Sequence, residues 1–200
     1  MRADLNTLER WIQPESSILD LGCGDGTLLA HLQKQSGIRG YGIEINIHKV
    51  IKSIEAGINV IQTDIATGLS NFRDGSFDYV IMTHTLQAVH HPDKLLKEML
   101  RVGRKSIVTF PNFGHWRCRL QIALLGQMPV TRHLPETWYE TSNIHNFTLK
   151  DFEKLCSSLD IAITRKTVVD YAHKGGVLCR LFPNTFGELA IYELVPSSSI

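Results

Sequence analysis

Three glycines stand at every second position, Gly22, Gly24 and Gly26, directly after a short apolar run that ends at Leu21. Glycine carries no side chain, so a ligand can approach its backbone closely, and it accepts backbone angles that other residues avoid. An amphipathic segment begins at Thr27. We therefore expect a strand, a glycine-rich turn and a helix, which are the parts that a backbone-bound cofactor requires.

The spacing of the glycines distinguishes between cofactors. A dinucleotide fingerprint, G-x-G-x-x-G, needs its third glycine at position 27, which is Thr27. Here the third glycine is Gly26, and Asp20 lies two residues before the first one. This pattern resembles the first motif of class I S-adenosylmethionine (SAM) methyltransferases. We therefore expect SAM or S-adenosylhomocysteine as the cofactor, bound around Asp20, Gly22, Cys23, Gly24, Asp25 and Gly26.

Acidic residues follow the next two predicted strands, at the edge where open parallel sheets bind ligands. Glu44 lies about 20 residues after the turn, where a carboxylate beside Ile45 can accept both ribose hydroxyls of a nucleoside. Asp64 can accept a hydrogen bond from the adenine amine, with the backbone N–H of Ile65 on the ring. The plainer alternatives are a solvated strand-end acid for Glu44 and a helix cap for Asp64.

The two aspartates of the turn have different predicted roles. We expect Asp20 to reach the amino group of the ligand, directly or through water. Asp25 is a weaker candidate, because an aspartate at this position can simply cap the helix that begins at Thr27.

His84 ends the fourth predicted strand, close to where a transferred methyl group would lie. It is a candidate general base, since histidine titrates near neutral pH, but we favour a role as a wall of the cofactor pocket. His84, His115 and His145 could meet above the cofactor. The chain has no H-E-x-x-H motif and its cysteines and histidines lack ligand spacing, so we expect no metal site.

Composition and missing motifs narrow the substrate. The net charge of +1 and the absence of a lysine-arginine stripe argue against a nucleic-acid partner. Amino-group methylases usually carry an Asn or Asp, then Pro-Pro and an aromatic residue, after the fourth strand, and here Met82-Thr83-His84-Thr85 stands in that place. A cytosine C5 methyltransferase would need a nucleophilic cysteine near a proline, and no cysteine is suitably placed. The four cysteines are widely spaced and predict reduced thiols, with Cys23 a small residue that fits the turn.

The elements that position these residues alternate along the chain. Leu5, Leu8 and Ile12 repeat at helical spacing before Pro14, a pattern unlike a signal peptide, and no apolar run is long enough to span a membrane. We therefore expect a cytoplasmic protein. The predicted strands cover 18–21, 40–44, 59–61, 77–82, 105–110, 161–169 and 188–195. Helices between the first five imply right-handed crossovers and a parallel sheet in one domain, residues 1–200.

The alternation pauses over residues 111–147, which we interpret as an insertion or lid with a helix around Trp116 to Leu124. Asn46 is expected to cap the helix that ends at Gly57, and Thr148 the helix over 149–159. Turns are predicted at Lys174-Gly175-Gly176 and at Pro183-Asn184.

Two segments of this insertion carry a more specific resemblance, to the methionine-biosynthesis protein MetW family. They are residues 107–117, IVTFPNFGHWR, with Gly126-Gln127-Met128-Pro129-Val130-Thr131 after it, and residues 138–145, WYETSNIH. The resemblance covers almost the whole chain. Two departures are Ser142, where a proline is usual, and Asn146-Phe147 after His145; neither touches the cofactor motifs.

The resemblance implies an α/β, Rossmann-like class I methyltransferase fold. Its sheet would have seven mostly parallel strands, an antiparallel last strand and helices on both faces. It also implies work with a homoserine O-acyltransferase, MetX, to form O-acylhomoserine, with the insertion as a docking surface. The alternative is an active SAM-dependent methyltransferase on a small molecule, with the insertion closing over the acceptor.

Overall fold

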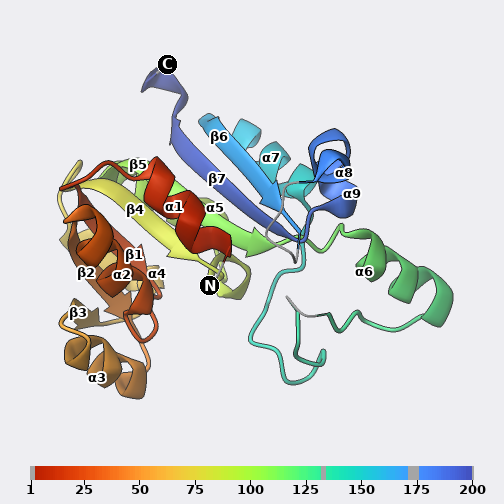
Figure 1. Cartoon of the computed structure of the whole chain (residues 1–200), viewed down its shortest axis with the longest axis horizontal. Coiled ribbons are helices and arrows are strands. Elements are labelled where there is room, and N and C mark those ends of the chain that lie inside the picture. Colours follow the sequence, from red (N-terminus) through yellow and green to blue (C-terminus); the bar gives the residue numbers. More distant parts are fainter. Residues whose placement is uncertain (1–2, 132–133, 171–175, 200) are drawn as a thin grey trace.

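Seven strands form a single sheet in the order β3-β2-β1-β4-β5-β7-β6 in the computed structural model, which describes residues 3–131, 134–170 and 176–199 (Figure 1). The strands are β1 (Ser17–Leu21), β2 (Arg39–Glu44), β3 (Asn59–Gln62), β4 (Phe77–Thr83), β5 (Gly103–Pro111), β6 (Ile161–Val169) and β7 (Leu189–Pro196). The first five strands pair in parallel, and β7 is antiparallel to both β5 and β6. This confirms the predicted mostly parallel sheet with an antiparallel last strand.

The helices cover both faces of this sheet (Figure 1). They are α1 (Ala3–Trp11), α2 (Thr27–Ser36), α3 (Ile47–Glu55), α4 (Ile65–Gly68), α5 (Pro92–Val102), α6 (Trp116–Leu120), α7 (Leu149–Ser158), α8 (Val177–Leu181) and α9 (Pro183–Phe186). Short 3-10 turns cover Leu69–Asn71, Leu86–Ala88 and Ser197–Ser199, and a π-helical turn, η3, covers Gln121–Leu125. No helix in the described ranges is long and apolar enough to cross a membrane.

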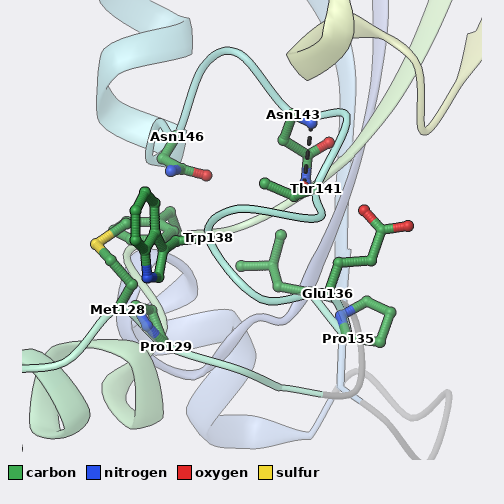
Figure 2. Close-up of a pocket in the computed structure, with 10 residues that line it drawn as sticks. Met128, Pro129, Pro135, Glu136, Trp138, Thr141, Asn143 and Asn146 are labelled. Carbon is green, nitrogen blue, oxygen red and sulfur yellow. Dashed lines mark hydrogen bonds between the residues drawn. The ribbon is translucent and has the colours of Figure 1, made fainter.

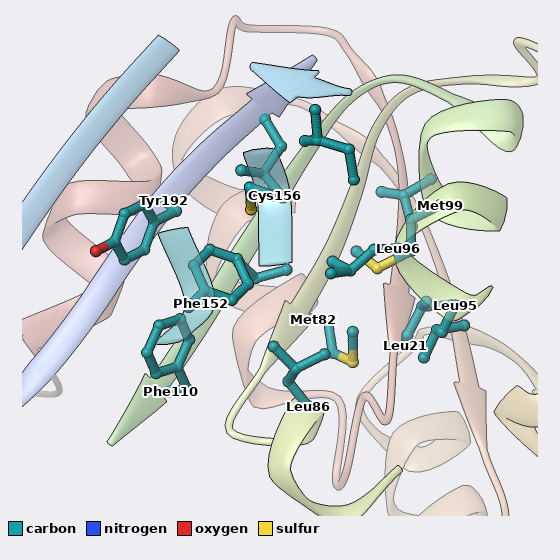
Figure 3. Close-up of a cluster of buried hydrophobic side chains, with 14 of the residues drawn as sticks. Leu21, Met82, Leu86, Leu95, Leu96, Met99, Phe110, Phe152, Cys156 and Tyr192 are labelled. Atoms are coloured by element: carbon teal, nitrogen blue, oxygen red, sulfur yellow. The ribbon is translucent and has the colours of Figure 1, made fainter. Parts of the chain in front are cut away.

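The core lies on the two faces of the sheet because successive strand residues point to opposite sides. On β4, Tyr79 and Ile81 pack under α1 and α2, whereas Val80 and Met82 pack under α5 and α7. Figure 3 shows the second of these clusters, in which Phe152 of α7 meets aromatic residues of β5 and β7. Burial on both faces makes the central strands continuous apolar runs, as in other parallel sheets.

The predicted helix boundaries are confirmed where capping chemistry defined them. Asn46 accepts hydrogen bonds from the N–H groups of His48 and Lys49 at the start of α3. Thr148 and Asp151 form a reciprocal capping box on α7. Gly37 ends α2 in the left-handed conformation that favours glycine.

One predicted turn is wrong. Pro183 does not form a turn with Asn184 but begins α9, and a second short helix, α8, precedes it. Proline suits the first position of a helix as well as a turn, because its fixed φ is helical and its missing N–H is not needed there. Gly176 lies at the start of α8, whereas Lys174 and Gly175 fall outside the described residues.

The segment predicted as an insertion separates β5 from α7 and carries the predicted helix around Trp116, formed by α6 and η3. In Figure 1, α6 lies at the end of the molecule remote from β2 and β3. Much of the remaining chain here is irregular and returns toward the sheet before Thr148.

Candidate cofactor-binding site

The glycine turn adopts a conformation that requires glycine at all three positions. Gly22, Gly24 and Gly26 have φ angles of 75°, 62° and 77°, in the left-handed region. The turn is joined to the end of β2, because the N–H groups of Gly22 and Cys23 both donate to the carbonyl of Ile43, at 2.8 and 3.0 Å. The predicted strand, turn and helix therefore lie together at the carboxyl edge of the sheet, where β1 and β4 mark the reversal of strand order.

The three glycines face different surroundings. A Cβ built on Gly22 would lie 2.8 Å from Thr85 Oγ1, and one on Gly26 would lie 3.1 Å from Ser53 Cα. Both positions are filled by neighbouring chain. In the described part of the molecule, no heavy atom other than those of Gly24 and its two chain neighbours lies within 4 Å of a Cβ built on Gly24. Of the three glycines of the turn, Gly24 is therefore the one whose Cα is left open to close approach by a ligand, while its N–H and carbonyl are bonded within the protein.

Glu44 holds the turn in place from β2. One oxygen of its carboxylate accepts from the Gly24 N–H at 3.0 Å, and the other accepts from the N–H groups of Ile45 and Asn46 at 3.0 and 2.9 Å. The residue is only 6% exposed. The oxygen bonded to Gly24 has a second lone pair, so it can accept one further hydrogen bond without losing the bond to Gly24, whereas the other oxygen already accepts two. Its position beside Gly24 suits the predicted ribose contact, which stays a prediction.

Ser53 and Thr85 support the turn and were missed in the sequence. The Ser53 hydroxyl donates to the Gly24 carbonyl at 3.0 Å and lies 3.8 Å from Cys23 Sγ, with no exposed surface. Its position three residues after the buried Val50 on α3 is the one sequence signal that could have indicated it. Thr85 has no such signal, because its contact with Gly22 depends on where the loop after β4 lies.

Cys23 is buried under the turn. Burial, reinforced by the negative charge of Asp20, raises the pKa of its thiol to about 11. A thiol that keeps its proton at neutral pH is a poor nucleophile. The geometry therefore fits the predicted role of a small packing residue.

The aspartates occupy three distinct environments. Asp20 is 1% exposed in β1, between Gly42 and Ile81 of the adjacent strands. The Asp25 carboxylate accepts from the Thr27 hydroxyl and N–H at 2.7 and 3.1 Å, and these bonds lower its pKa. Asp64 caps α4 by accepting from the Ala66 N–H at 2.9 Å, and Ile65 is the first residue of that helix. The capping alternatives weighed for Asp25 and Asp64 are therefore present, and neither excludes contact with a ligand.

His84 follows β4 with a φ of 54°, an unusual angle for a residue with a side chain. Its N–H donates to the Thr109 carbonyl of β5 at 3.0 Å, which holds the loop against the sheet. Gln87, three residues further on, was missed in the sequence. Its side-chain amide donates to the His84 carbonyl at 2.9 Å. Its backbone carbonyl accepts from the N–H groups of Ile144 and His145 at 2.8 and 2.9 Å. Gln87 thus joins the post-β4 loop to the end of the insertion.

The histidines considered together in the sequence have separate neighbours. His115 lies with Nε2 3.7 Å from a Glu188 oxygen, whereas Nε2 of His145 lies 3.4 Å from the His90 carbonyl. Within the described ranges, no group of three His, Cys, Asp or Glu side chains is placed to hold a metal ion.

A cavity of about 290 Å³ opens in the insertion beyond the end of β5 (Figure 2). Phe113, Leu134 and the Trp138 indole form apolar walls, and Glu136 and Asn146 supply polar groups. In Figure 2 the Trp138 ring lies beside Met128, and Thr141 and Asn143 are joined by a hydrogen bond of 3.1 Å. The cavity is large enough for a small molecule of modest size.

The strand order and the glycine turn together identify the fold as that of class I SAM-dependent methyltransferases. An S-adenosylmethionine dependent methyltransferase from Mesorhizobium loti superposes with a TM-score of 0.70 at 15% identity, covering 96% of this chain and 97% of that one. The family model for methionine biosynthesis protein MetW matches residues 2–194. The chain belongs to the MetW family, as its strand-five and insertion motifs predicted.

Two curated relatives extend this comparison. The bifunctional methionine biosynthesis protein MetXA/MetW of Rhodopirellula baltica is 35% identical over 179 residues, which are 85% of this chain and 29% of that protein. Norajmaline N-methyltransferase of Rauvolfia serpentina is 30% identical over 93 residues, 44% of this chain and 32% of that one. The chain therefore spans about a third of the length of these relatives.

Proposed function

We propose that this protein binds SAM at the carboxyl edge of the sheet and acts with a homoserine O-acyltransferase, MetX, to form O-acylhomoserine in methionine biosynthesis. The observation that supports SAM binding is the open space beside the Cα of Gly24, whose N–H donates to the Glu44 carboxylate at 3.0 Å. The ammonium of SAM is cationic, and the buried acid Asp20 suits such a group.

The proposed contacts follow the geometry of the turn. Glu44, with Ile45 after it, accepts the ribose hydroxyls, Asp64 and the Ile65 N–H take the adenine, and Asp20 takes the amino group of the ligand. Gly22, Cys23, Asp25 and Gly26 shape the turn, and His84 forms a wall near the sulfonium. We assign His84 no catalytic step.

The partnership with an acyltransferase is supported by the bifunctional relative, whose name joins MetXA and MetW in one protein. A SAM-binding subunit could report the end product of the pathway to the acyltransferase that commits homoserine to it. Such coupling requires that SAM bind two states of the complex with different affinity. We treat residues 1–200 as one domain, because the seven strands share one sheet. We place the protein in the cytoplasm, because its four cysteines are free.

The test combines the purified chain with the acyltransferase of the same organism, homoserine, an acyl-CoA and SAM. We expect the chain to form a complex and to change the rate of acyl transfer. If neither the rate nor the size of the acyltransferase in solution changes, the partnership is wrong.

A second candidate function, methyl transfer to a small molecule, is favoured by the cavity beyond β5 (Figure 2). Methyl transfer from a sulfonium mainly needs alignment of donor and acceptor, so a positioned base is not essential. Labelled SAM that yields a labelled small-molecule product without the acyltransferase would favour this function over the first.

A further inference from the structure

We propose that α6, η3 and α8 form the surface on which the acyltransferase docks, and that the matching acyltransferase surface is apolar with carboxylates at its edge. This surface, the α6–α8 face, consists of residues 116–125 and 177–181. The inference rests on the proposed function, because it assumes that an acyltransferase partner exists.

The first observation is that α6 and η3 carry large apolar side chains that the protein itself leaves uncovered. Leu124 is 74% exposed, Leu125 is 64% exposed and Leu120 is 44% exposed. All five residues of η3 are exposed or half-buried. Helices this short are marginal in water without packing. A contiguous exposed apolar surface of this kind marks an interaction site.

The second observation is that the base of this helix is firmly attached. The Asn112 amide donates to the carbonyls of Asn184 and Gly187, at 3.0 and 2.8 Å. The Arg119 guanidinium donates to the Gly114 carbonyl at 2.6 Å. The exposed leucines are therefore presented on an anchored element, which lowers the entropic cost of binding a partner.

The third observation is that α8 extends the same surface. Trp116 and Arg117 of α6 line one cavity of about 460 Å³ together with Val177 and Leu178 of α8. Figure 1 shows both helices at the same end of the molecule. Val177 is 73% exposed and Leu181 is 66% exposed. Two segments about 60 residues apart in sequence thus form one apolar surface.

The charges of this face identify the kind of partner. Residues 116–125 and 177–181 contain Arg117, Arg119 and Arg180, all exposed, and no aspartate or glutamate. Two acidic residues outside these ranges, Asp170 and Glu188, also line the cavity. Asp170 is half-buried, and Glu188 is mostly buried beneath the face, 4.0 Å from Arg117. A partner with carboxylates around an apolar patch would therefore be complementary. A second copy of this chain would not be, since a two-fold contact through this face sets arginine against arginine.

The experiment measures binding of the acyltransferase of the same organism to the full chain by calorimetry or surface plasmon resonance. The variants Leu124→Asp and Leu178→Asp introduce a charge at exposed positions, so neither disturbs the core. We expect each to weaken the complex at least tenfold, as loss of an interface anchor does, with SAM affinity unchanged. Arg180→Glu should weaken the complex most at low salt, because exposed charges are screened as salt rises.

The matched control is Ile54→Asp on α3, at the other end of the molecule, where an isoleucine is similarly exposed at 59% (Figure 1). We expect this variant to bind like the wild type. If Ile54→Asp weakens the complex and the α6–α8 variants do not, the docking surface is α3 and this inference is wrong. If the wild-type chain does not bind the acyltransferase, the proposed function is contradicted instead. If the chain alone forms dimers that persist in Arg180→Glu and are lost in Leu124→Asp, the occupant of this face is a second copy of the chain and this inference is wrong.

Discussion

Replacement of Glu44 by alanine gives the most direct test of the cofactor site. The carboxylate accepts three backbone hydrogen bonds at 2.9–3.0 Å, from Gly24, Ile45 and Asn46. In the proposed complex it also accepts the ribose hydroxyls, and its one free lone pair takes the first of them without loss of a backbone bond. Hydrogen bonds to charged groups contribute about 1.5–3 kcal/mol each, so the loss of one raises the Kd for SAM about 10- to 100-fold. Loss of the backbone bonds lowers the free energy of unfolding by about 1–3 kcal/mol.

Asp78→Ala is the matched control for this change. Asp78 accepts from the Ser17 N–H and hydroxyl at 2.9 and 2.8 Å, at the opposite end of β1 and β4. These bonds lower the pKa of Asp78, so its carboxylate also stabilises the fold. We expect a comparable loss of stability in urea unfolding and an unchanged Kd for SAM in calorimetry.

The conservative variant Glu44→Gln should not rescue binding. Both carboxylate oxygens accept backbone N–H groups, so the amide nitrogen of glutamine must face a donor, either at Gly24 or at the Ile45 and Asn46 pair. The reasoning is refuted if Glu44→Ala binds SAM as tightly as the wild type. It is refuted equally if Asp78→Ala loses as much SAM affinity, because the loss would then reflect weakened folding alone.

Three further predictions concern the turn, the capping box and the thiols. Gly24→Ala should abolish SAM binding while lowering the free energy of unfolding by only about 1–2 kcal/mol. Its control is Gly75→Ala, because Gly75 has the same φ of 62° and similarly open surroundings within the described chain. This control should cost the same stability and leave SAM affinity intact in calorimetry. Thr148→Ala should lower the free energy of unfolding by about 1 kcal/mol in urea. The hydrogen bonds from Thr148 lower the pKa of the Asp151 carboxyl, so this difference between variant and wild type should shrink as pH falls below 3.8. A difference that stays constant with pH would contradict the prediction. Burial raises the pKa of Cys23 to about 11 and of Cys156 to about 12, against 9.0 for an ordinary thiol. The unfolded state therefore holds fewer protons above pH 9, so unfolding free energy should fall between pH 9 and 11, and Cys156→Ala should flatten that slope.

Much of the fold is predictable because the decisive interactions are local. The apolar run before Gly22 and the caps at Asn46 and Thr148 each act within a few residues of the chain. The two short helices α8 and α9 are not predictable in this way. Pro183 suits both a turn and a helix start, and a helix of four or five residues has too few positions to show periodicity.

The supports of the candidate site depend on tertiary contacts. Ser53 contacts the Gly24 carbonyl from another helix, and Gln87 binds the insertion through backbone groups about 57 residues further along the chain. Hydrogen bonds to backbone leave no sequence pattern, because every residue type offers the same carbonyl and every one but proline the same N–H. The link between the post-β4 loop and the insertion therefore appears only in the folded structure.

The sequence by itself determined the glycine turn, the acids at successive strand ends and the motifs of the MetW family, because backbone preference and spacing are properties of the chain. The tertiary structure decided that the Glu44 carboxylate reaches the Gly24 N–H and that α6 and α8 share one surface. Strand pairing in the sheet sets those distances. Parallel pairing brings the ends of β1 and β2 together, and the antiparallel β7 returns the chain from α8 and α9 alongside β5, next to the base of α6.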